Sequence, residues 1–382
     1  MIKRDVVWSV DVTGAELKAT MRASALSNVS AQPPTPSSGN ARAPIGIFDS
    51  GFGGLTVARE VARALPAESI IYLGDSARCP YGPRDPLEVR DLVRRICEWL
   101  VSRDVKMIVI ACNTATAAGL ETARREFDLP VLGVIEPGAR AAARETKNAR
   151  VGVIATKGTV NSGAYSKAIR ALDPDITVFS TPTPRFVEIA EAGVKMARGP
   201  IEDYTSLASK VYIRAEFQEI ARDYLEPLRR CDIDTLVLGC THFPLLKSLI
   251  GSVIGRDVRL INSAREVARD VKRVLMSENL CAGVCDNSRG SSPAENNLCA
   301  GGRDDASARN DANAMSGAGE RDGAGAVASC EFGVNTGNVG ATDGIDSPAY
   351  EFFTTGDDLA EFKKFGERVF RQPLTNVSHV DI

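Results

Sequence analysis

Apolar residues follow two alternating patterns along this chain. Short uninterrupted runs, such as IGIF at 45–48 and KMIVIA at 106–111, are typical of strands buried on both faces of a parallel sheet. Longer segments such as 86–104 have apolar residues every three or four positions and predict helices that pack one face on such a sheet. The chain therefore belongs to the α/β class. We expect strands within 45–50, 69–75, 106–112, 129–139, 149–156, 176–184, 234–240, 260–271 and 349–355, and helices at 86–104, 113–127, 201–229, 244–255 and 357–370.

The second half of this pattern repeats the first. Residues 43–54 read APIGIFDSGFGG and residues 149–160 read ARVGVIATKGTV, in each case a strand, a small polar residue and the start of a helix. Each half also has a later strand that ends in cysteine, Cys112 in VIACNTATA and Cys240 in VLGCTHFP. A repeat of this kind predicts two pseudo-symmetric α/β domains with mainly parallel sheets. In such sheets ligands bind at the carboxyl ends of the strands, where both cysteines fall.

Two segments depart from the α/β pattern. Residues 1–43 end in a stretch rich in Ser, Pro and Ala, and residues 279–346 consist largely of Gly, Ala, Asn, Asp and Ser. Neither can bury enough apolar surface to offset the entropy of ordering. We therefore expect a disordered N-terminal extension at 1–43 and a low-complexity insertion at 279–346. The domains expected around them are 44–138 with 261–382, and 139–260.

Composition excludes several classes of protein. The 382 residues are 44% hydrophobic and 25% charged, with a net charge of −3, so no basic excess is available to neutralise a nucleic acid. No apolar stretch approaches the roughly 18 residues of a membrane span, and the N-terminus lacks the apolar core of a secretory signal. These features predict a cytoplasmic protein. The nine cysteines are then expected to be free thiols.

Cys112 and Cys240 are the main candidates for chemistry. Helices that start after their strands would offer N–H donors to a carboxylate and would lower the pKa of a nearby thiol. Two thiols in matching settings suggest a pair of bases that face one substrate, although two buried structural cysteines are the simpler alternative. A cysteine hydrolase with His242 as the base and Asn113 as its orienting residue is a further alternative, which leaves the second cysteine unused.

Other residues near these cysteines allow a weaker metal hypothesis and an anion hypothesis. Cys112, Cys240, His242 and Asp49 could ligate zinc, but neither C-x-x-C nor paired-histidine spacing is present, so we expect no metal. Asp49 and Ser50 precede a glycine-rich turn that does not match G-x-G-x-x-G. They either cap the following helix or place a carboxylate, a hydroxyl and backbone N–H groups beside a small anion.

Five short segments of the chain are the most distinctive: IGIFDSGFGGLTV, YLGDSARCPYG, VIACNTATA, GVIEPGA and VLGCTHFPLL. Together they resemble the glutamate racemases, the cofactor-independent branch of the aspartate/glutamate racemase superfamily. The resemblance extends over about residues 44–276, and 352–370 resembles the C-terminal end of the family. It implies an active site in the cleft between two domains, no cofactor, and a 1,1-proton transfer that interconverts L- and D-glutamate for peptidoglycan synthesis.

The resemblance also implies roles for individual residues. Cys112 and Cys240 would be the acid/base pair, with Cys112 acting on D-glutamate and Cys240 on L-glutamate. Asp49 would assist Cys112, His242 would assist Cys240, and Glu191 would be an auxiliary carboxylate, unless it is simply a solvated residue of a helix. Cys79 would lie near the site. The implied substrate contacts are Asp49, Ser50, Tyr81, Gly82, Asn113, Thr114, Thr241 and His242.

Two alternatives stay open at this point. A racemase of the same superfamily could act on another substrate, such as aspartate or a hydantoin. A non-catalytic binding protein could have kept the cleft, although both thiols and their assisting residues argue against it. The expected partner is the small-molecule substrate, glutamate, with no nucleic acid or membrane, and a homodimer is compatible with the sequence.

Overall fold

The computed structural model describes residues 40–197, 214–282 and 348–382, which belong to one compact unit. Most of the predicted extension at 1–43 and of the predicted insertion at 279–346 lies outside the described residues. The same holds for the first part of the helix predicted at 201–229.

The first of two sheets contains six strands within the described ranges, and every neighbouring pair is parallel. Their order across the sheet is β10-β9-β2-β1-β3-β4. The central strands β1, β2 and β3 are buried along their whole length, which explains their uninterrupted apolar sequences. The bounds are β1 (Ile45–Asp49), β2 (Ile70–Gly74), β3 (Met107–Ile110), β4 (Val131–Gly133), β9 (Tyr350–Thr354) and β10 (Val377–His379).

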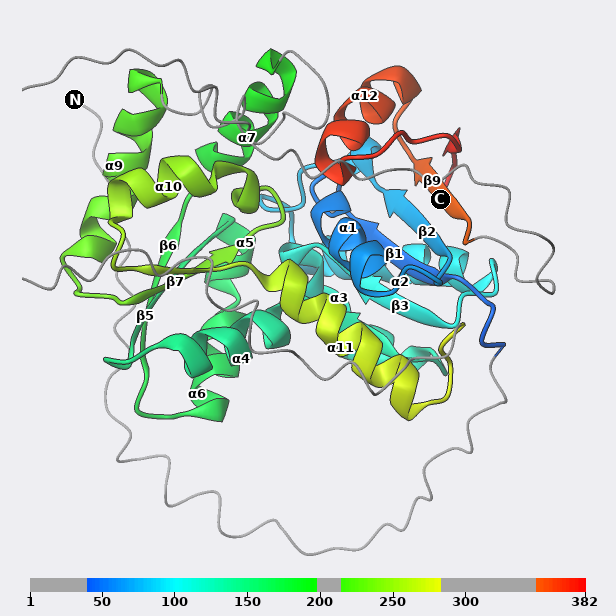
Figure 1. Cartoon of the computed structure of the whole chain (residues 1–382), viewed down its shortest axis with the longest axis horizontal. Coiled ribbons are helices and arrows are strands. Elements are labelled where there is room, and N and C mark those ends of the chain that lie inside the picture. The colour runs from blue at the N-terminus through cyan, green and yellow to red at the C-terminus, as the bar shows by residue number, and fades with distance from the viewer. Residues whose placement is uncertain (1–39, 198–213, 283–347) are drawn as a thin grey trace, which may run out of the picture. The chain divides into compact units, whose positions relative to one another are not determined.

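The second sheet is also parallel and has the order β6-β5-β7-β8. Its strands lie apart from those of the first sheet, as Figure 1 shows for β5–β7 (green to yellow-green) and β1–β3 (blue to cyan). The bounds are β5 (Arg150–Ala155), β6 (Thr177–Pro182), β7 (Thr235–Gly239) and β8 (Arg259–Ile261). Two parallel α/β halves of this kind confirm the predicted fold class.

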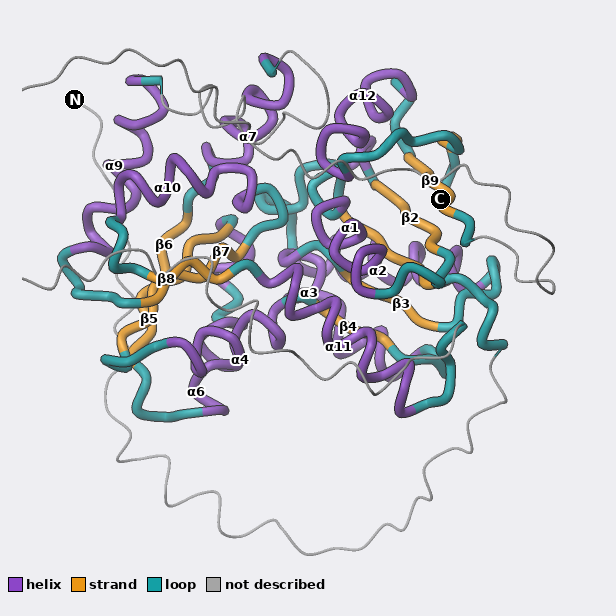
Figure 2. The backbone as a smooth tube through the Cα atoms, viewed as in Figure 1, coloured by secondary structure: helices purple, strands orange, loops and turns teal. Residues whose placement is uncertain are grey.

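Helices surround the strands of both sheets (Figure 2). Those of the described part of the chain are α1 (Leu55–Ala64), α2 (Pro86–Val101), α3 (Asn113–Glu126), α4 (Ile135–Glu145), α5 (Lys157–Asn161), α6 (Ala164–Leu172), α7 (Arg185–Met196), α9 (Ala215–Arg229), α10 (Lys247–Ile254), α11 (Ser263–Ser277) and α12 (Leu359–Phe370), with short 3₁₀ turns at Ser76–Arg78 and Phe243–Leu246. No helix among them has the length and apolar content that crossing a membrane requires.

Side chains alternate between the two faces of the first sheet, so two cores form. Ile45 and Ile47 of β1 pack with α1, α11 and α12, while Phe48 packs on the other face with α2 and α3. The second sheet packs α4 and α6 on one face. Its other face packs α7, α9 and α10 and shares the Ile45 core, so one continuous hydrophobic cluster joins both halves.

Two expected strands are different in the structure. In the strand predicted at 129–139, only Val131–Gly133 is extended, and helix α4 begins at Ile135. Pro137 is tolerated in its first turn because N–H groups there have no acceptor within the helix. The strand expected at 260–271 for the first sheet is wrong as well. Arg259–Ile261 pairs with β7 in the second sheet, and α11 follows, capped by the Asn262 side chain.

The internal repeat places equivalent residues at equivalent positions in the two sheets. β1 lies beside β3, with Phe48 opposite Ile110, and β5 lies beside β7, with Ala155 opposite Gly239. Each sheet therefore brings a cysteine next to the loop that follows its first strand. The domain limits at 138/139 and 260/261 stay a prediction.

Candidate active site

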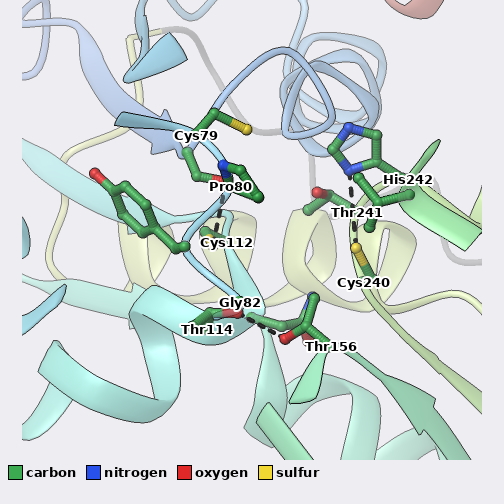
Figure 3. A pocket seen from close by; sticks show the side chains of 13 residues that line it. Cys79, Pro80, Gly82, Cys112, Thr114, Thr156, Cys240, Thr241 and His242 are labelled. Atoms are coloured by element: carbon green, nitrogen blue, oxygen red, sulfur yellow. Dashed lines mark hydrogen bonds between the residues drawn. The ribbon is translucent and has the colours of Figure 1, made fainter. Parts of the chain in front are cut away.

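A narrow cavity lies between the loops at the carboxyl ends of both sheets (Figure 3). Cys112 follows β3 of the first sheet and Cys240 follows β7 of the second, and both are free thiols that line this cavity. In Figure 3 they lie on different sides of it. The lining residues are Ser50, Cys79, Pro80, Tyr81, Gly82, Cys112, Asn113, Thr114, Thr156, Val187, Cys240, Thr241 and His242.

Cys112 is buried at the N-terminus of α3. Its Sγ accepts a hydrogen bond from the Ala115 N–H at 3.5 Å and lies 3.8 Å from Ser50 Oγ. The helix N-terminus was expected to lower the pKa of this thiol, but the net effect of its surroundings is the opposite. Burial, followed by the charge of Asp49, raises the pKa of Cys112 above its ordinary value and outweighs the Ala115 hydrogen bond. Thiolate formation at Cys112 therefore depends on the donors around it.

Cys240 has an imidazole as its partner. His242 Nδ1 lies 3.8 Å from Cys240 Sγ, and His242 Nε2 lies 3.5 Å from Glu191 Oε1, an ion-pair distance without hydrogen-bond geometry. Burial alone would lower the pKa of His242, but the contacts with Cys240 and Glu191 outweigh it and raise the pKa from 6.5 to about 10. An imidazolium at neutral pH would place a positive charge beside the sulfur of Cys240.

The backbone N–H groups of the glycine-rich turn after β1 bind a carboxylate of the protein, that of Asp49. The Asp49 carboxylate accepts hydrogen bonds from the N–H groups of Gly54 at 2.9 Å and Gly51 at 3.3 Å, and Thr241 Oγ1 donates to it at 3.5 Å. Asp49 is buried and does not line the cavity. It acts on Cys112 through its charge, whereas Ser50 makes the side-chain contact.

Gly53 and Phe52 of the same turn pack against the His242 ring. A Cβ on Gly53 would lie 2.6 Å from both Cε1 and Nδ1 of His242, so only glycine leaves room for the ring. Phe52 meets the imidazole edge-to-face with ring centroids 5.2 Å apart, and Phe365 of α12 packs behind Phe52 at 5.2 Å. The C-terminal helix thus supports the His242 side of the cavity.

Hydroxyl and amide groups form the opposite wall. Thr114 Oγ1 lies 2.9 Å from Thr156 Oγ1, a hydrogen bond that joins the first half of the fold to the second. Asn113 Oδ1 accepts a hydrogen bond from Tyr165 at 2.8 Å, while its buried Nδ2 has no hydrogen-bond partner among the residues that the structure describes. An unpaired buried donor beside a cavity is suited to bind a carboxylate oxygen of a ligand.

Tyr81 and Gly82 contribute shape to the cavity. The Tyr81 hydroxyl donates to the buried Asp75 carboxylate, so the tyrosine offers its ring to the site. A Cβ on Gly82 would lie 2.9 Å from Thr156 Cβ, and the Gly82 carbonyl accepts a hydrogen bond from the Gly158 N–H at 3.0 Å. Gly82 is therefore a point of close approach between the two halves.

Most of the predicted site residues lie on the cavity wall, while Asp49 and Glu191 act from behind it. Sequence reasoning missed Pro80, Thr156 and Val187. Thr156 had a signal, because the repeat aligns it with Ser50. Among the described residues, no group of three or more His, Cys, Asp or Glu side chains is arranged to hold a metal ion.

The raised pKa of His242 predicts a pH dependence of stability. Since the folded pKa of about 10 exceeds the ordinary 6.5, the stabilisation is complete below about pH 6.5 and is lost as the pH rises through 10. In the unaltered protein this loss should lower the free energy of unfolding by on the order of a few kcal/mol. The variant His242→Asn has no imidazole to titrate, so its stability should not fall in this way. Urea denaturation between about pH 6 and 10.5 measures it. Parallel profiles for the two proteins would contradict the assignment.

The geometry already defines a class of site. Two α/β halves each supply one thiol to a shared cavity that also has hydroxyl and amide groups on its wall. Such a site suits proton transfer at a small anionic substrate held between two bases.

Comparison with known proteins identifies the family. The family model described as Asp/Glu/Hydantoin racemase matches residues 45–271, more than half of the chain. The chain therefore belongs to the Asp/Glu/hydantoin racemase family and is an amino-acid racemase.

Individual relatives agree with this assignment. The sequence is 48% identical over 236 residues to a glutamate racemase from Geobacter metallireducens, which covers 62% of this chain and 81% of that protein. The structure of glutamate racemase isoform RacE1 from Bacillus anthracis aligns with a TM-score of 0.65 and 34% identity, over 90% of this chain and 99% of that chain. Francisella tularensis glutamate racemase in complex with D-glutamate aligns with a TM-score of 0.64 and 26% identity, over 89% and 98%.

Proposed function

We propose that this protein is a cofactor-independent glutamate racemase that interconverts L- and D-glutamate by proton transfer between two thiols. The observation that carries the proposal is the pair of free thiols, Cys112 and Cys240, which line one cavity from equivalent strands of two α/β halves. The resemblance to the Francisella enzyme crystallised with D-glutamate supports this choice of substrate.

In the proposed reaction one thiolate takes the α-proton from one face of glutamate. The C–H electron pair stays on Cα as a carbanion, and the thiol on the other side donates its proton to the opposite face. The two cysteines end with exchanged protonation states, so the same site works in both directions. His242 supports the thiolate of Cys240, while the Ala115 N–H and Ser50 support that of Cys112.

The cavity wall offers suitable groups for the rest of the substrate. We assign the two carboxylates to Ser50, Asn113, Thr114 and Thr241, with Tyr81 and Gly82 fixing the shape of the wall. Nδ2 of Asn113, a buried donor with no hydrogen-bond partner among the described residues, would bind one carboxylate oxygen. The charge of Asp49 behind the wall would favour the substrate ammonium, and Glu191 would keep His242 charged.

The biological role we propose is the supply of D-glutamate for peptidoglycan, in the cytoplasm. Both assignments extend the resemblance to the glutamate racemases. Their test is separate from that of the chemistry: depletion of the protein should make cell-wall growth dependent on added D-glutamate.

Circular dichroism tests the activity directly. The purified full chain, without added cofactor, should bring the signal of L-glutamate to zero, since the two enantiomers have equal free energy, and should do the same from D-glutamate. L-aspartate and a substituted hydantoin serve as matched substrates for the alternative specificities. Racemisation of either of these faster than glutamate, or a requirement for pyridoxal phosphate, would overturn the proposal.

A further inference from the structure

Tyr165 is a buried tyrosine behind the cavity wall that has no part in the proton transfer described above. It belongs to α6, in the second half of the fold, and is not among the residues that line the cavity. Its hydroxyl donates a hydrogen bond of 2.8 Å to Oδ1 of Asn113, the residue that follows Cys112 in the first half. A side chain of one half thus contacts the cavity wall of the other.

Two glycines leave the space that Tyr165 fills. A Cβ on Gly239, the last residue of β7, would lie 3.1 Å from Cε2 of Tyr165, and a Cβ on Gly138 of α4 would lie 3.2 Å from its hydroxyl oxygen. Such distances are tighter than ordinary van der Waals contact, so the side chain is closely packed on both sides. Because Gly239 directly precedes Cys240, Tyr165 lies beside the neighbours of both candidate bases.

The amide of Asn113 has an acceptor end and a donor end, and only the donor end suits an anion. With Oδ1 bound to Tyr165, the buried Nδ2 keeps both N–H groups without a hydrogen-bond partner among the described residues. In the reversed orientation Oδ1 would take that place, and it would repel a substrate carboxylate. The hydrogen bond from Tyr165 therefore selects the orientation that binds a carboxylate.

We propose that Tyr165 is a positioning residue, which holds Oδ1 of Asn113 so that the Nδ2 donors face a carboxylate group of the substrate. The inference deepens the proposed function and rests on it for the identity of the ligand, glutamate. Thr114, the next residue, also bonds to the second half, through Thr156 at 2.9 Å (Figure 3). The first turn of α3 thus has two side-chain hydrogen bonds to the other half, which fix the wall beside Cys112.

The Tyr165 hydroxyl stays protonated across the neutral range. Burial, followed by the charge of Cys240, raises the pKa of Tyr165 above its ordinary value. A donor that does not titrate near neutral pH keeps the Asn113 amide in one orientation, whichever of the two thiols carries the proton.

Tyr165→Phe removes the hydroxyl and keeps the ring, so it tests the hydrogen bond without emptying the space. Two-dimensional NMR of the full chain, labelled with ¹⁵N in its asparagine side chains, reports on the Asn113 amide without turnover. The Asn113 signals are assigned by their absence from Asn113→Ala. We expect them to shift and broaden in Tyr165→Phe, because the released amide turns between two orientations. The control Tyr350→Phe, on β9 and outside the cavity, should leave them unchanged.

A double-mutant cycle connects this orientation to the substrate. KM and kcat for glutamate are compared in the unaltered protein, Tyr165→Phe, Asn113→Ala and the double variant. Each single change should raise KM roughly tenfold, with a smaller effect on kcat, because a carboxylate contact is the same in the ground state and the transition state. If Tyr165 acts through Asn113, the double variant should have the KM of Asn113→Ala within a factor of about two.

Two results would overturn the role of Tyr165. One is an Asn113 signal that is unchanged in Tyr165→Phe, and the other is a pair of KM effects that multiply in the double variant, as two independent packing defects would. Racemic glutamate added to the labelled unaltered protein separates this failure from that of the proposed function. Asn113 signals that respond to Tyr165→Phe but not to glutamate would support the orienting hydrogen bond and would count against glutamate as the substrate.

Discussion

Replacement of Cys112 or Cys240 by alanine is expected to lower kcat for glutamate racemisation by about a thousandfold or more in both directions. Each thiol is needed twice per cycle of interconversion, once as a base and once as an acid. General acid–base groups contribute typically 10²–10⁴-fold each, and loss of either thiol leaves one face of the substrate without its base. Circular dichroism with each enantiomer measures the loss.

The control for this experiment is Cys231→Ala, because Cys231 is a partly buried cysteine that does not line the cavity. It should retain kcat within a factor of about two, as expected for a change outside a functional site. A single alanine variant at Cys112 or Cys240 that racemised glutamate at the unaltered rate would exclude that thiol as one of the two bases.

Gly53→Ala is expected to lower kcat roughly 100-fold without unfolding the protein. A methyl group at this position would lie 2.6 Å from the His242 ring and 2.6 Å from Thr241 Oγ1, so both side chains must move. A displacement of about 1 Å in a catalytic group can cost 10²-fold in rate. Steady-state kinetics give kcat, and thermal unfolding reports whether the fold is retained.

Gly251→Ala is the matched control on helix α10, where the nearest atom to an added Cβ is Leu260 Cδ1 at 3.9 Å. There alanine should be neutral or should stabilise the helix by about 0.5–1 kcal/mol. If Gly53→Ala kept full activity, the close packing of the turn against His242 would not matter for catalysis.

The sequence allowed much of the site to be predicted because its main residues end apolar strands. Cys112 and Cys240 follow uninterrupted apolar runs that favour buried strands, and a parallel sheet brings such ends to one edge. The start of α4 was not predictable in the same way. The apolar run at 131–135 continues from strand into helix, and periodicity does not separate a buried strand from a buried helical turn.

The contacts between the two halves could not be predicted from the sequence either. The Thr114–Thr156 hydrogen bond depends on how the sheets face each other, although the repeat marks Thr156 as the counterpart of Ser50. The pKa of Cys112 depends on a balance between burial and one backbone donor, and the sequence indicates only the donor. Likewise, the glycine turn predicted an anion but not that the anion is Asp49.

The central claim is that two thiols act as separate bases on opposite faces of the substrate. Racemisation of protiated L-glutamate in D₂O, sampled at low conversion, tests it most directly, with deuterium at Cα measured separately in the two enantiomers. The two-thiol site predicts D-glutamate that carries solvent deuterium and remaining L-glutamate that is still protiated. Product that retains the proton of the substrate, or deuterium that enters both pools equally from the start, would contradict the claim.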